Sequence, residues 1–346
     1  MKILLTADPE IPVPPKFYGG IERIVDGLIT EMRFRGHTVG LVANANSQSK
    51  VDYLRAWSSD NSTNRFSHIQ NTFTLSKAVR EFQPQIVHSF SRLGYLLPLL
   101  PSRLPKVMSY QRHTGGRQIR IANRLAGDSL KFTGCSEFVA RMGRSWGSDW
   151  VAVPNFVDTE FYTFSPAVAD DAPLVFLSRL ERIKGAHTAI AIARKSGRRL
   201  ILAGNRVAHN DGEEYWKSEI EPHLDRDSVT YVGPLNDDQK KRLLSGAAAL
   251  IVPIEWDEPF GIVFAEALAC GTPVIACARG ALPEIVRHGV EGFLIKSVSE
   301  GCEAVEKLGS IKRVDCRKRV EEQFSRKVVV GRYDLLYKRL LNTTHL

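Results

Sequence analysis

Short apolar runs alternate with longer amphipathic segments along this chain, and the alternation breaks once before it resumes. Apolar runs of strand length occur first at residues 2–6, 38–43, 85–89, 106–109 and 131–135, and then at 173–178, 199–203, 228–232, 248–253, 273–276 and 292–295. The amphipathic segments predict helices at 20–35, 72–82 with Asn71 as N-cap, 185–195, 237–245, 261–270 and 282–286. Strands that alternate with helices form parallel sheets, so the chain is predicted to be an α/β protein.

The break at residues 154–173 divides the chain into two domains. This stretch contains three prolines and a run of acidic and small residues, and we interpret it as an interdomain linker. We therefore expect two Rossmann-like domains, 1–160 and 161–324, that face each other across a cleft. Residues 325–341 have a helical pattern, which leaves open whether the C-terminal segment 325–346 completes the second domain or packs back on the first.

The charge balance limits the possible partners. The chain carries 47 Lys/Arg and 38 Asp/Glu, and residues 1–160 hold 20 and 13 of these, a net charge of +7. This basic first half predicts an acidic partner, either a phosphorylated ligand or an anionic membrane surface. Nucleic acid is not expected, because basic stripes interleaved with aromatic residues are absent. No apolar stretch approaches the roughly 18–20 residues of a membrane-spanning helix, and no signal peptide is recognisable, so we expect a cytoplasmic protein.

The most informative stretch runs from residue 255 to 291, with the sequence EWDEPFGIVFAEALACGTPVIACARGALPEIVRHGVE. It follows a predicted strand, and Gly261 permits a tight turn into a helix. The start of a helix offers unpaired N–H groups and a positive dipole end, which suit a diphosphate or sugar hydroxyls. Glu258 before this helix and Glu266 within it can each accept two hydroxyl hydrogen bonds, as the diols of a sugar or ribose require. Taken singly, each is also explained as an ordinary solvated glutamate.

A second informative loop has the sequence SRLERIKG and joins the strand that ends at Ser178 to the helix that starts near Gly185. Arg179 and Lys184 lie on this loop at the carboxyl end of the strand, where two cations can grip a diphosphate. Fixed positive charges there can stabilise negative charge on a diphosphate without a metal. A solvated basic loop is the alternative, and Arg182 is expected to be exposed.

The first half contains three further candidate residues and one weaker one. Gly19 and Gly20 precede the first helix, and two glycines let the backbone approach a ligand closely. His113 follows the strand that ends at residue 109, which places it on the rim of the expected cleft. His88, at the end of another strand, is the weaker candidate.

Other chemistries lack their sequence signals. No His, Asp, Glu or Cys residues have metal-ligand spacing, so no metal is expected; Asp257 beside Glu258 has no histidine nearby. No G-x-G-x-x-G motif follows the first strand, and no P-loop lysine motif occurs. These absences argue against the usual dehydrogenases and NTPases, and no cofactor is expected beyond the substrates.

The 255–291 stretch resembles the E-x7-E signature of family 4 glycosyltransferases. The matching elements are Glu258-Pro-Phe-Gly261, Glu266-Ala-Leu-Ala, Gly271-Thr-Pro and Gly280-Ala-Leu-Pro-Glu284-Ile-Val. The resemblance implies a GT-B fold, a nucleoside-diphosphate sugar as donor, a hydroxyl acceptor, and retention of anomeric configuration. As the nucleotide of the donor, UDP is slightly favoured over GDP. It also implies that Glu258 lies by the donor sugar, that Glu266 holds the ribose hydroxyls, and that Phe260, Gly261 and Ile262 contribute to the donor site.

The resemblance extends to other positions. The loop with Arg179 and Lys184 is similar to the family's G/S-R-x-x-x-x-K-G motif, and the Gly19–Gly20 pair matches glycines that face the donor phosphate and acceptor in the family. A histidine near the donor sugar follows the equivalent strand in many members, which is the role implied for His113. Two departures are Ala281, where a second glycine is frequent, and the lack of a common tryptophan at 325–327.

Alternatives to a glycosyltransferase remain. An epimerase or phosphorylase on the same fold would need other catalytic groups, such as a pyridoxal lysine, and none is identifiable. A non-enzymatic basic binding protein is the other alternative. Arg117, Arg120 and Arg124 recur at helical spacing in GGRQIRIANRLAG, and we interpret them either as a surface that docks on anionic lipid at the inner face of the membrane or as a solvated helix face.

Overall fold

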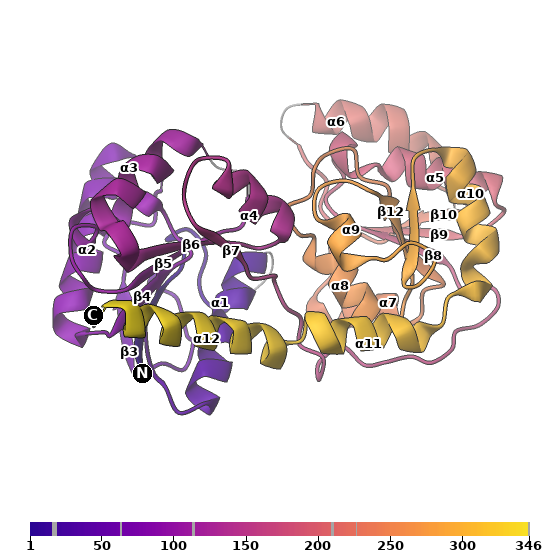
Figure 1. Cartoon of the computed structure of the whole chain (residues 1–346). Coiled ribbons are helices and arrows are strands. Elements are labelled where there is room, and N and C mark those ends of the chain that lie inside the picture. Colours follow the sequence, from indigo (N-terminus) through magenta and orange to yellow (C-terminus); the bar gives the residue numbers. More distant parts are fainter. Residues whose placement is uncertain (16–18, 63, 113–114, 209–210, 226, 345–346) are drawn as a thin grey trace. The chain divides into compact units, whose positions relative to one another are not determined.

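The chain folds into two units, each with its own parallel sheet, and this confirms the predicted α/β class (Figure 1). Unit 1 is Met1–Asn155 together with Arg326–Leu346, and unit 2 is Phe156–Ser325. The computed structural model describes residues 1–15, 19–62, 64–112, 115–208, 211–225 and 227–344. Within these ranges, no helix has both the length and the apolar character needed to cross a membrane.

Unit 1 is built on a seven-stranded sheet in which all neighbouring strands are parallel. The strands, in sheet order, are β3 (Tyr53–Ala56), β2 (Thr38–Ala43), β1 (Lys2–Thr6), β4 (Ile86–Ser89), β5 (Lys106–Tyr110), β6 (Leu130–Gly134) and β7 (Trp150–Ala152). The central strands β1 and β4 are almost completely buried. A parallel sheet covered on both faces requires buried strands of this kind, which explains the apolar residues 3–5 of β1 and 86–87 of β4. The last two residues of β4, His88 and Ser89, are polar, and their side chains are hydrogen-bonded.

The helices of unit 1 cover both faces of its sheet. They are α1 (Gly20–Phe34), α2 (Arg65–Phe82), α3 (Gly116–Ala126), α4 (Glu137–Arg144) and α12 (Arg326–Thr344), with the short helices η1 (Leu93–Leu99) and η2 (Gly127–Ser129). The chain crosses the sheet in one direction from β1 to β3 and in the other from β3 to β7. Because crossovers are right-handed, α1 covers one face, and α2, η1, α3 and α4 cover the other. Helix α12 packs beside α1 (Figure 1).

A buried hydrogen-bond network attaches α12 to the sheet of unit 1. Nδ1 of His88 lies 2.5 Å from the hydroxyl of Tyr337, and Nε2 lies 2.6 Å from Oγ of Ser109. The His88 side chain is fully buried, and burial lowers its pKa to about 3. His88 is therefore a neutral core residue, and the prediction that it borders a ligand site is wrong. The C-terminal helix α12 therefore packs back on the first domain and does not complete the second.

Unit 2 is built on a six-stranded parallel sheet. In sheet order its strands are β10 (Val229–Tyr231), β9 (Leu200–Ala203), β8 (Leu174–Leu177), β11 (Ala249–Val252), β12 (Val274–Cys277) and β13 (Gly292–Ile295). Its helices are η3 (Arg182–Lys184), α5 (Ala186–Lys195), α6 (Gly212–Tyr215), η4 (Trp216–Ile220), η5 (Glu221–His223), α7 (Asp237–Ser245), α8 (Ile262–Ala269), α9 (Leu282–Ile285), α10 (Val298–Glu306), η6 (Lys307–Ser310) and α11 (Arg313–Gln323).

Helix α2 begins earlier than the sequence pattern predicts. Its N-cap is Asn64, whose side chain accepts a hydrogen bond from the N–H of Phe66. Asn71, predicted as the cap, is buried inside the helix, and its amide donates to the carbonyl oxygen of Ser59 at 2.9 Å. The prediction fails because the first turns of α2 do not place apolar residues on the buried side.

Most of the predicted linker belongs to unit 2. Residues 156–173 lie within that unit, and the N–H of Val157 donates to the carbonyl of Phe324 at 2.9 Å. Tyr162 is buried, so this segment contributes to the core of unit 2 even though its composition is typical of a linker. The division falls between Asn155 and Phe156.

Candidate functional site

The strand order of unit 2 changes direction between β8 and β11, and the candidate site lies at the carboxyl ends of these two strands. Ligands of open parallel sheets bind at such a point, because the loops that follow the two strands diverge. The two loops are joined by their backbones: the N–H of Glu255 donates to the carbonyl of Ile183 at 2.8 Å. Gly185 has φ +76°, and a Cβ there would lie 2.1 Å from the carbonyl oxygen of Pro253, so a larger residue would separate the loops.

Lys184 and Glu258 form the centre of the candidate site. Nζ of Lys184 lies 2.7 Å from Oε2 of Glu258, and the two side chains are only 10% and 14% exposed. The indole N–H of Trp256 donates to the same Oε2 at 2.9 Å, and the Lys184 ammonium lies 4.5 Å from the centre of the Trp256 ring. Both bonds fall on Oε2, so Oε1 can accept a hydrogen bond from a ligand hydroxyl.

The loop after β12 fixes the backbone of Glu258. The Glu258 carbonyl accepts a hydrogen bond from the N–H of Ala281 at 2.9 Å. Gly280 has φ +58°, and a Cβ there would lie 2.3 Å from the same carbonyl oxygen. Ala281 itself has φ −83°, which any residue adopts, so the absence of the second family glycine leaves this contact intact.

Arg179 and Lys184 have different partners. Arg179 forms an ion pair with Glu181 at 2.8 Å and is exposed over nearly half of its side chain. Arg182 is similarly exposed and forms an ion pair with Glu219 at 3.1 Å, as expected of a residue outside the site. Of the two cations predicted to grip a diphosphate, Lys184 is therefore enclosed against Glu258, and Arg179 faces solvent.

Glu266 lies inside α8 and is held by two side chains that the sequence analysis did not predict. Its Oε1 accepts hydrogen bonds from the hydroxyl of Tyr162 and from Nζ of Lys240, each at 2.6 Å. Burial, reinforced by the nearby Glu266, raises the pKa of the Tyr162 phenol well above its usual range, so it remains a donor. Tyr162 lies in the segment interpreted as a linker, and Lys240 lies in α7. Neither residue is part of a recognisable sequence motif.

The turn before α8 is shaped by three of the predicted donor-site residues. Gly261 has φ +81° and directly precedes the helix, and a Cβ there would lie 2.5 Å from the ring of Phe264. Phe260 is buried with its ring centre 5.7 Å from that of Phe324, and Ile262 is half-buried at the first position of the helix. The side chain of Phe260 therefore anchors the turn in the core. A ligand at this turn can accept hydrogen bonds from the backbone N–H groups at the start of α8.

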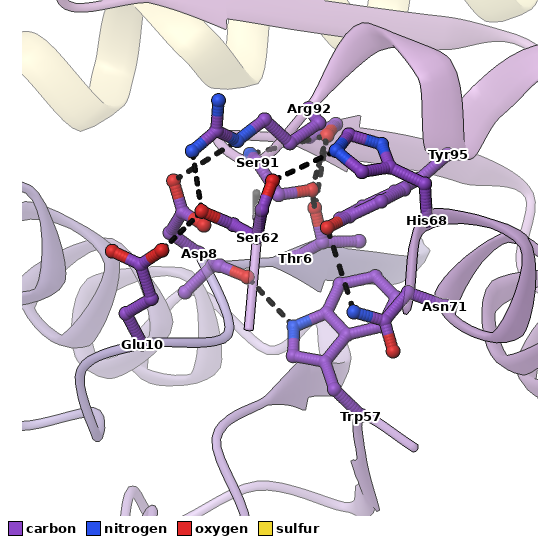
Figure 2. Close-up of polar contacts among 12 residues, drawn as sticks. Thr6, Asp8, Glu10, Trp57, Ser62, His68, Asn71, Ser91, Arg92 and Tyr95 are labelled. Carbon is purple, nitrogen blue, oxygen red and sulfur yellow. Dashed lines mark hydrogen bonds and ion pairs between the residues drawn. The ribbon is translucent and has the colours of Figure 1, made fainter. Parts of the chain in front are cut away.

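Unit 1 also has a change of strand direction, between β1 and β4, and polar side chains gather at the carboxyl ends of these strands (Figure 2). The hydroxyl groups of Thr6, Ser89 and Ser91 lie 2.8–3.0 Å from one another. The indole N–H of Trp57 donates to the carbonyl of Ala7 at 2.8 Å and fixes the chain just beyond β1.

Asp8 and Arg92 face each other in this cluster (Figure 2). Nε of Arg92 lies 3.9 Å from Oδ2 of Asp8, while another guanidinium nitrogen donates to Oγ of Ser62, which in turn bonds to Glu10. Burial raises the pKa of Asp8 although Arg92 opposes the change. Within the described residues, Oδ1 of Asp8 and Nε of Arg92 are buried without hydrogen-bond partners. Unpaired buried groups are costly, so the cluster suits a ligand with both donors and acceptors.

The Gly19–Gly20 pair lies next to a buried carboxyl group. Gly20 is the first residue of α1, and Gly19 before it has φ +154°. A Cβ on Gly19 would lie 2.9 Å from a carboxylate oxygen of Glu22. Glu22 is 4% exposed, and burial together with the charges of Asp8 and Glu10 raises its pKa to about 7. His113, the remaining candidate of this half, lies outside the described residues.

We expect Glu22→Gln to stabilise the protein more at pH 8 than at pH 5. A carboxyl group with a pKa of about 7 in the folded protein and 4.5 in the unfolded chain binds more protons when folded, so stability falls as the pH rises from 4.5 through 7. Glutamine removes this cost, which is roughly 1.4 kcal/mol for each pKa unit. Melting temperatures of both proteins across this pH range measure the effect, and a difference independent of pH would contradict it.

Among the residues whose placement is described, no three His, Cys, Asp or Glu side chains are grouped so that they could hold a metal ion. The polar groups of the two clusters are instead carboxylates paired with lysine or arginine. Such groups suit ligands that carry hydroxyls and phosphates.

Comparison with solved structures shows that the fold is shared. The chain is similar to a glycosyltransferase from Rickettsia africae (TM-score 0.81, 17% identity, 98% of each chain covered). It is also similar to sucrose-phosphate synthase from Thermosynechococcus elongatus (TM-score 0.77, 19% identity, 99% of each chain). A third is AviGT4, a glycosyltransferase involved in avilamycin A biosynthesis (TM-score 0.74, 23% identity, 99% of this chain and 98% of that one). The expected GT-B fold with two Rossmann-like domains is confirmed.

Sequence comparison finds relatives of higher identity that match over a shorter part of the chain. A segment of 130 residues, 36% of this chain, is 32% identical to an uncharacterized glycosyltransferase of Methanocaldococcus jannaschii. A segment of 146 residues, 40% of the chain, is 32% identical to the D-inositol 3-phosphate glycosyltransferase of Mycobacterium tuberculosis. The matched segments span 32% and 30% of these relatives, about a third of their length.

Two family models match the chain one after the other. Residues 18–161 match the model described as Glycosyltransferase Family 4, and residues 158–322 match the model described as Glycosyl transferases group 1. The first covers most of unit 1, and the second covers most of unit 2, including Lys184, Glu258 and Glu266. The chain therefore belongs to family 4 of the glycosyltransferases.

Proposed function

We propose that this protein transfers a sugar from a nucleoside-diphosphate sugar to a hydroxyl group of an acceptor, with retention of anomeric configuration and without a metal ion. The observation that carries the proposal is the enclosed Lys184–Glu258 pair at the switch point between β8 and β11. A carboxylate that accepts hydroxyl hydrogen bonds lies there next to a cation that attracts phosphate, and a sugar diphosphate needs both.

The donor is assigned to unit 2. In this proposal Glu258 accepts hydrogen bonds from hydroxyls of the donor sugar, Lys184 and Arg179 contact the diphosphate, and Glu266 holds the ribose. The N–H groups at the start of α8, after Gly261, add donors for phosphate oxygens. UDP is the preferred nucleotide, and one neighbour supports this choice: HepE of Anabaena, similar in fold with a TM-score of 0.73 at 19% identity, has been solved in complex with UDP-glucose.

The chemistry requires one bond to break and one to form at the anomeric carbon. The bond from this carbon to the β-phosphate oxygen breaks, and the acceptor oxygen attacks from the same face. The acceptor proton passes to the departing phosphate oxygen, so no protein nucleophile takes part. Negative charge grows on the diphosphate during this step, and the fixed cations Lys184 and Arg179 stabilise it there.

The acceptor is assigned to the polar cluster of unit 1. Asp8 and Glu10 can accept hydrogen bonds from hydroxyls, and Arg92 can donate to ring or hydroxyl oxygens. The unpaired atoms Asp8 Oδ1 and Arg92 Nε would gain partners when such a group binds. A polyhydroxylated acceptor, such as a sugar, fits this mixture better than a purely apolar one does.

Two measurements on the purified protein test the proposal. Thermal shift against UDP-, GDP- and ADP-sugars should give a rise in melting temperature with one nucleotide class, because a ligand that binds only the native state stabilises it. Transfer from that donor should persist in EDTA, since Lys184 and Arg179 take the place of a metal. Loss of activity in EDTA that a divalent ion restores would contradict the metal-independent part. No stabilisation by any sugar nucleotide would contradict the donor class.

A further inference from the structure

The first half of α2 carries its large apolar side chains on the outside. Phe66, Ile69 and Phe73 recur at spacings of three and four residues, and each is more than half exposed. The buried side of the same turns is polar and consists of Ser67, Asn71 and Thr74. A helix that packs on a sheet normally has the opposite arrangement, with the apolar stripe inside. Local rules of this kind are broken chiefly at functional positions.

The polar inner side of α2 has a local explanation. Asn71 donates to the carbonyl of Ser59 and lies 3.4 Å from the hydroxyl of Tyr95, and Ser67 accepts a hydrogen bond from Oγ of Ser59 at 2.9 Å. These contacts hold the loop before α2 and support the polar cluster of unit 1 (Figure 2). These contacts do not explain why the outer side of α2 carries exposed apolar side chains.

Neighbouring elements extend the apolar surface. η1 packs against α2 and exposes Leu97, and α3 exposes Ile121 and Leu125. Helices α2 and α3 cover the same face of the sheet in unit 1 (Figure 1). We call this surface the α2–α3 face; its apolar side chains are exposed between 47% and 69%, and they are Phe66, Ile69, Phe73, Leu97, Ile121 and Leu125. An exposed apolar patch marks an interaction site.

The charges on the α2–α3 face have one predominant sign. α2, η1 and α3 together contain six Lys/Arg, all exposed, and one Asp/Glu. The cations are Arg65, Lys77, Arg80, Arg117, Arg120 and Arg124. The acid, Glu81, already accepts hydrogen bonds from Tyr53 and Arg55. Cations around exposed aromatic and aliphatic side chains complement the surface of an anionic bilayer, where phosphates lie above the acyl chains.

We infer that the α2–α3 face docks unit 1 on an anionic membrane surface. Phe66, Ile69 and Phe73 enter the headgroup layer, and the surrounding arginines and lysines contact lipid phosphates. This inference goes beyond the proposed transfer reaction and does not depend on it. The sequence pattern indicates only the part of this surface that includes α3, whereas the structure adds the exposed apolar side chains of α2 and η1, which make the binding more than electrostatic.

Co-sedimentation with vesicles tests the inference. One set of vesicles contains phosphatidylcholine alone, and the other contains equal parts of phosphatidylcholine and phosphatidylglycerol. We expect the protein to pellet with the anionic vesicles, to pellet much less with the neutral ones, and to be released in part by high salt, which shortens the range of the attraction from about 8 Å to about 3 Å. Protein that stays in the supernatant with anionic vesicles at low salt would overturn the inference, and so would equal binding to both sets.

Matched variants locate the binding surface. Phe66→Ser, Ile69→Ser and Phe73→Ser combined should lower the bound fraction about tenfold, since apolar insertion and lipid attraction act together. Phe34→Ser is the control: Phe34 is 86% exposed at the end of α1, which covers the other face of the sheet, and this change should have no effect. All four side chains are exposed, so circular dichroism should show an unchanged fold. Undiminished binding by the triple variant, or an equal loss with Phe34→Ser, would exclude this surface as the docking site.

Discussion

Glu258→Gln is expected to lower kcat by at least about a hundredfold while the protein stays folded. Oε2 of Glu258 accepts hydrogen bonds from Lys184 at 2.7 Å and from Trp256 at 2.9 Å. A glutamine of the same shape keeps one acceptor but loses the charge that pairs with the ammonium group and strengthens bonds to sugar hydroxyls. Loss of one such contact in the transition state costs roughly 3 kcal/mol. Steady-state kinetics with the donor identified by thermal shift measure kcat.

The control for this variant is in the same loop. Glu255 lies three positions before Glu258, but its side chain is 43% exposed and lies 3.1 Å from Nε2 of His187. Glu255→Gln should therefore leave kcat within about twofold of the wild type, since exposed ion pairs contribute little. Wild-type turnover in Glu258→Gln would rule out the proposed role of this residue. An equal loss in both variants would show that the loop as a whole, rather than Glu258, had been disturbed.

The sequence predicts the buried part of the fold well and its edges poorly. Central strands such as β11 and β12 are continuous apolar runs because both faces of the sheet are covered, and this signal is hard to mistake. The edge strand β3 alternates half-buried and exposed residues, and β7 has only three residues, so neither produces such a run. Helix α2 was predicted too short because its apolar residues face outward, which is the reverse of the pattern used to detect a helix.

The candidate site was predicted in part for a related reason. Lys184 and Glu258 lie between a strand and the helix that follows it, and Glu266 lies inside the helix after Glu258. These positions along the chain agree with a ligand site at the sheet edge. Their partners carry no such signal. Tyr162 and Lys240 meet Glu266 across 104 and 26 positions of the chain, and only the folded sheet brings them together. In the sequence, Tyr162 is one tyrosine in a proline-containing segment that is typical of a linker. Its contact with Glu266 becomes evident only in the folded structure.

The same reasoning applies to the polar cluster of unit 1. Asp8, Ser62 and Arg92 come from three separate segments, the loops after β1 and before α2 and the start of η1, and each is an ordinary polar loop residue when taken alone. The cluster becomes recognisable because β1 and β4 are neighbours in the sheet although 80 or so positions separate them, and because the chain changes direction there.

Lys184→Ala is expected to lower kcat/KM for the donor by about a hundredfold or more. The change removes the cation that stabilises the departing diphosphate, and it leaves the Glu258 carboxylate, only 14% exposed, with Trp256 as its remaining donor. An unpaired charge in such a position is costly, so we expect weaker binding of the donor and a slower transfer step. Arg182→Ala is the control from the same loop, because Arg182 is exposed and pairs with Glu219, away from Glu258.

Combining Lys184→Ala with Glu258→Gln tests whether the effects of the two residues depend on each other. If the pair at 2.7 Å is the functional element, either single change already destroys it, and the double variant should be little worse than the more damaging single variant. Independent roles predict instead that the two losses multiply, to about ten-thousandfold if each single loss is about a hundredfold. Wild-type kcat/KM in Lys184→Ala, or the same loss in Arg182→Ala, would exclude a specific role for Lys184. A multiplicative double variant would keep both residues in the site but would show that Lys184 on the diphosphate and Glu258 on the sugar act separately, so that the contact between them is not itself the functional element.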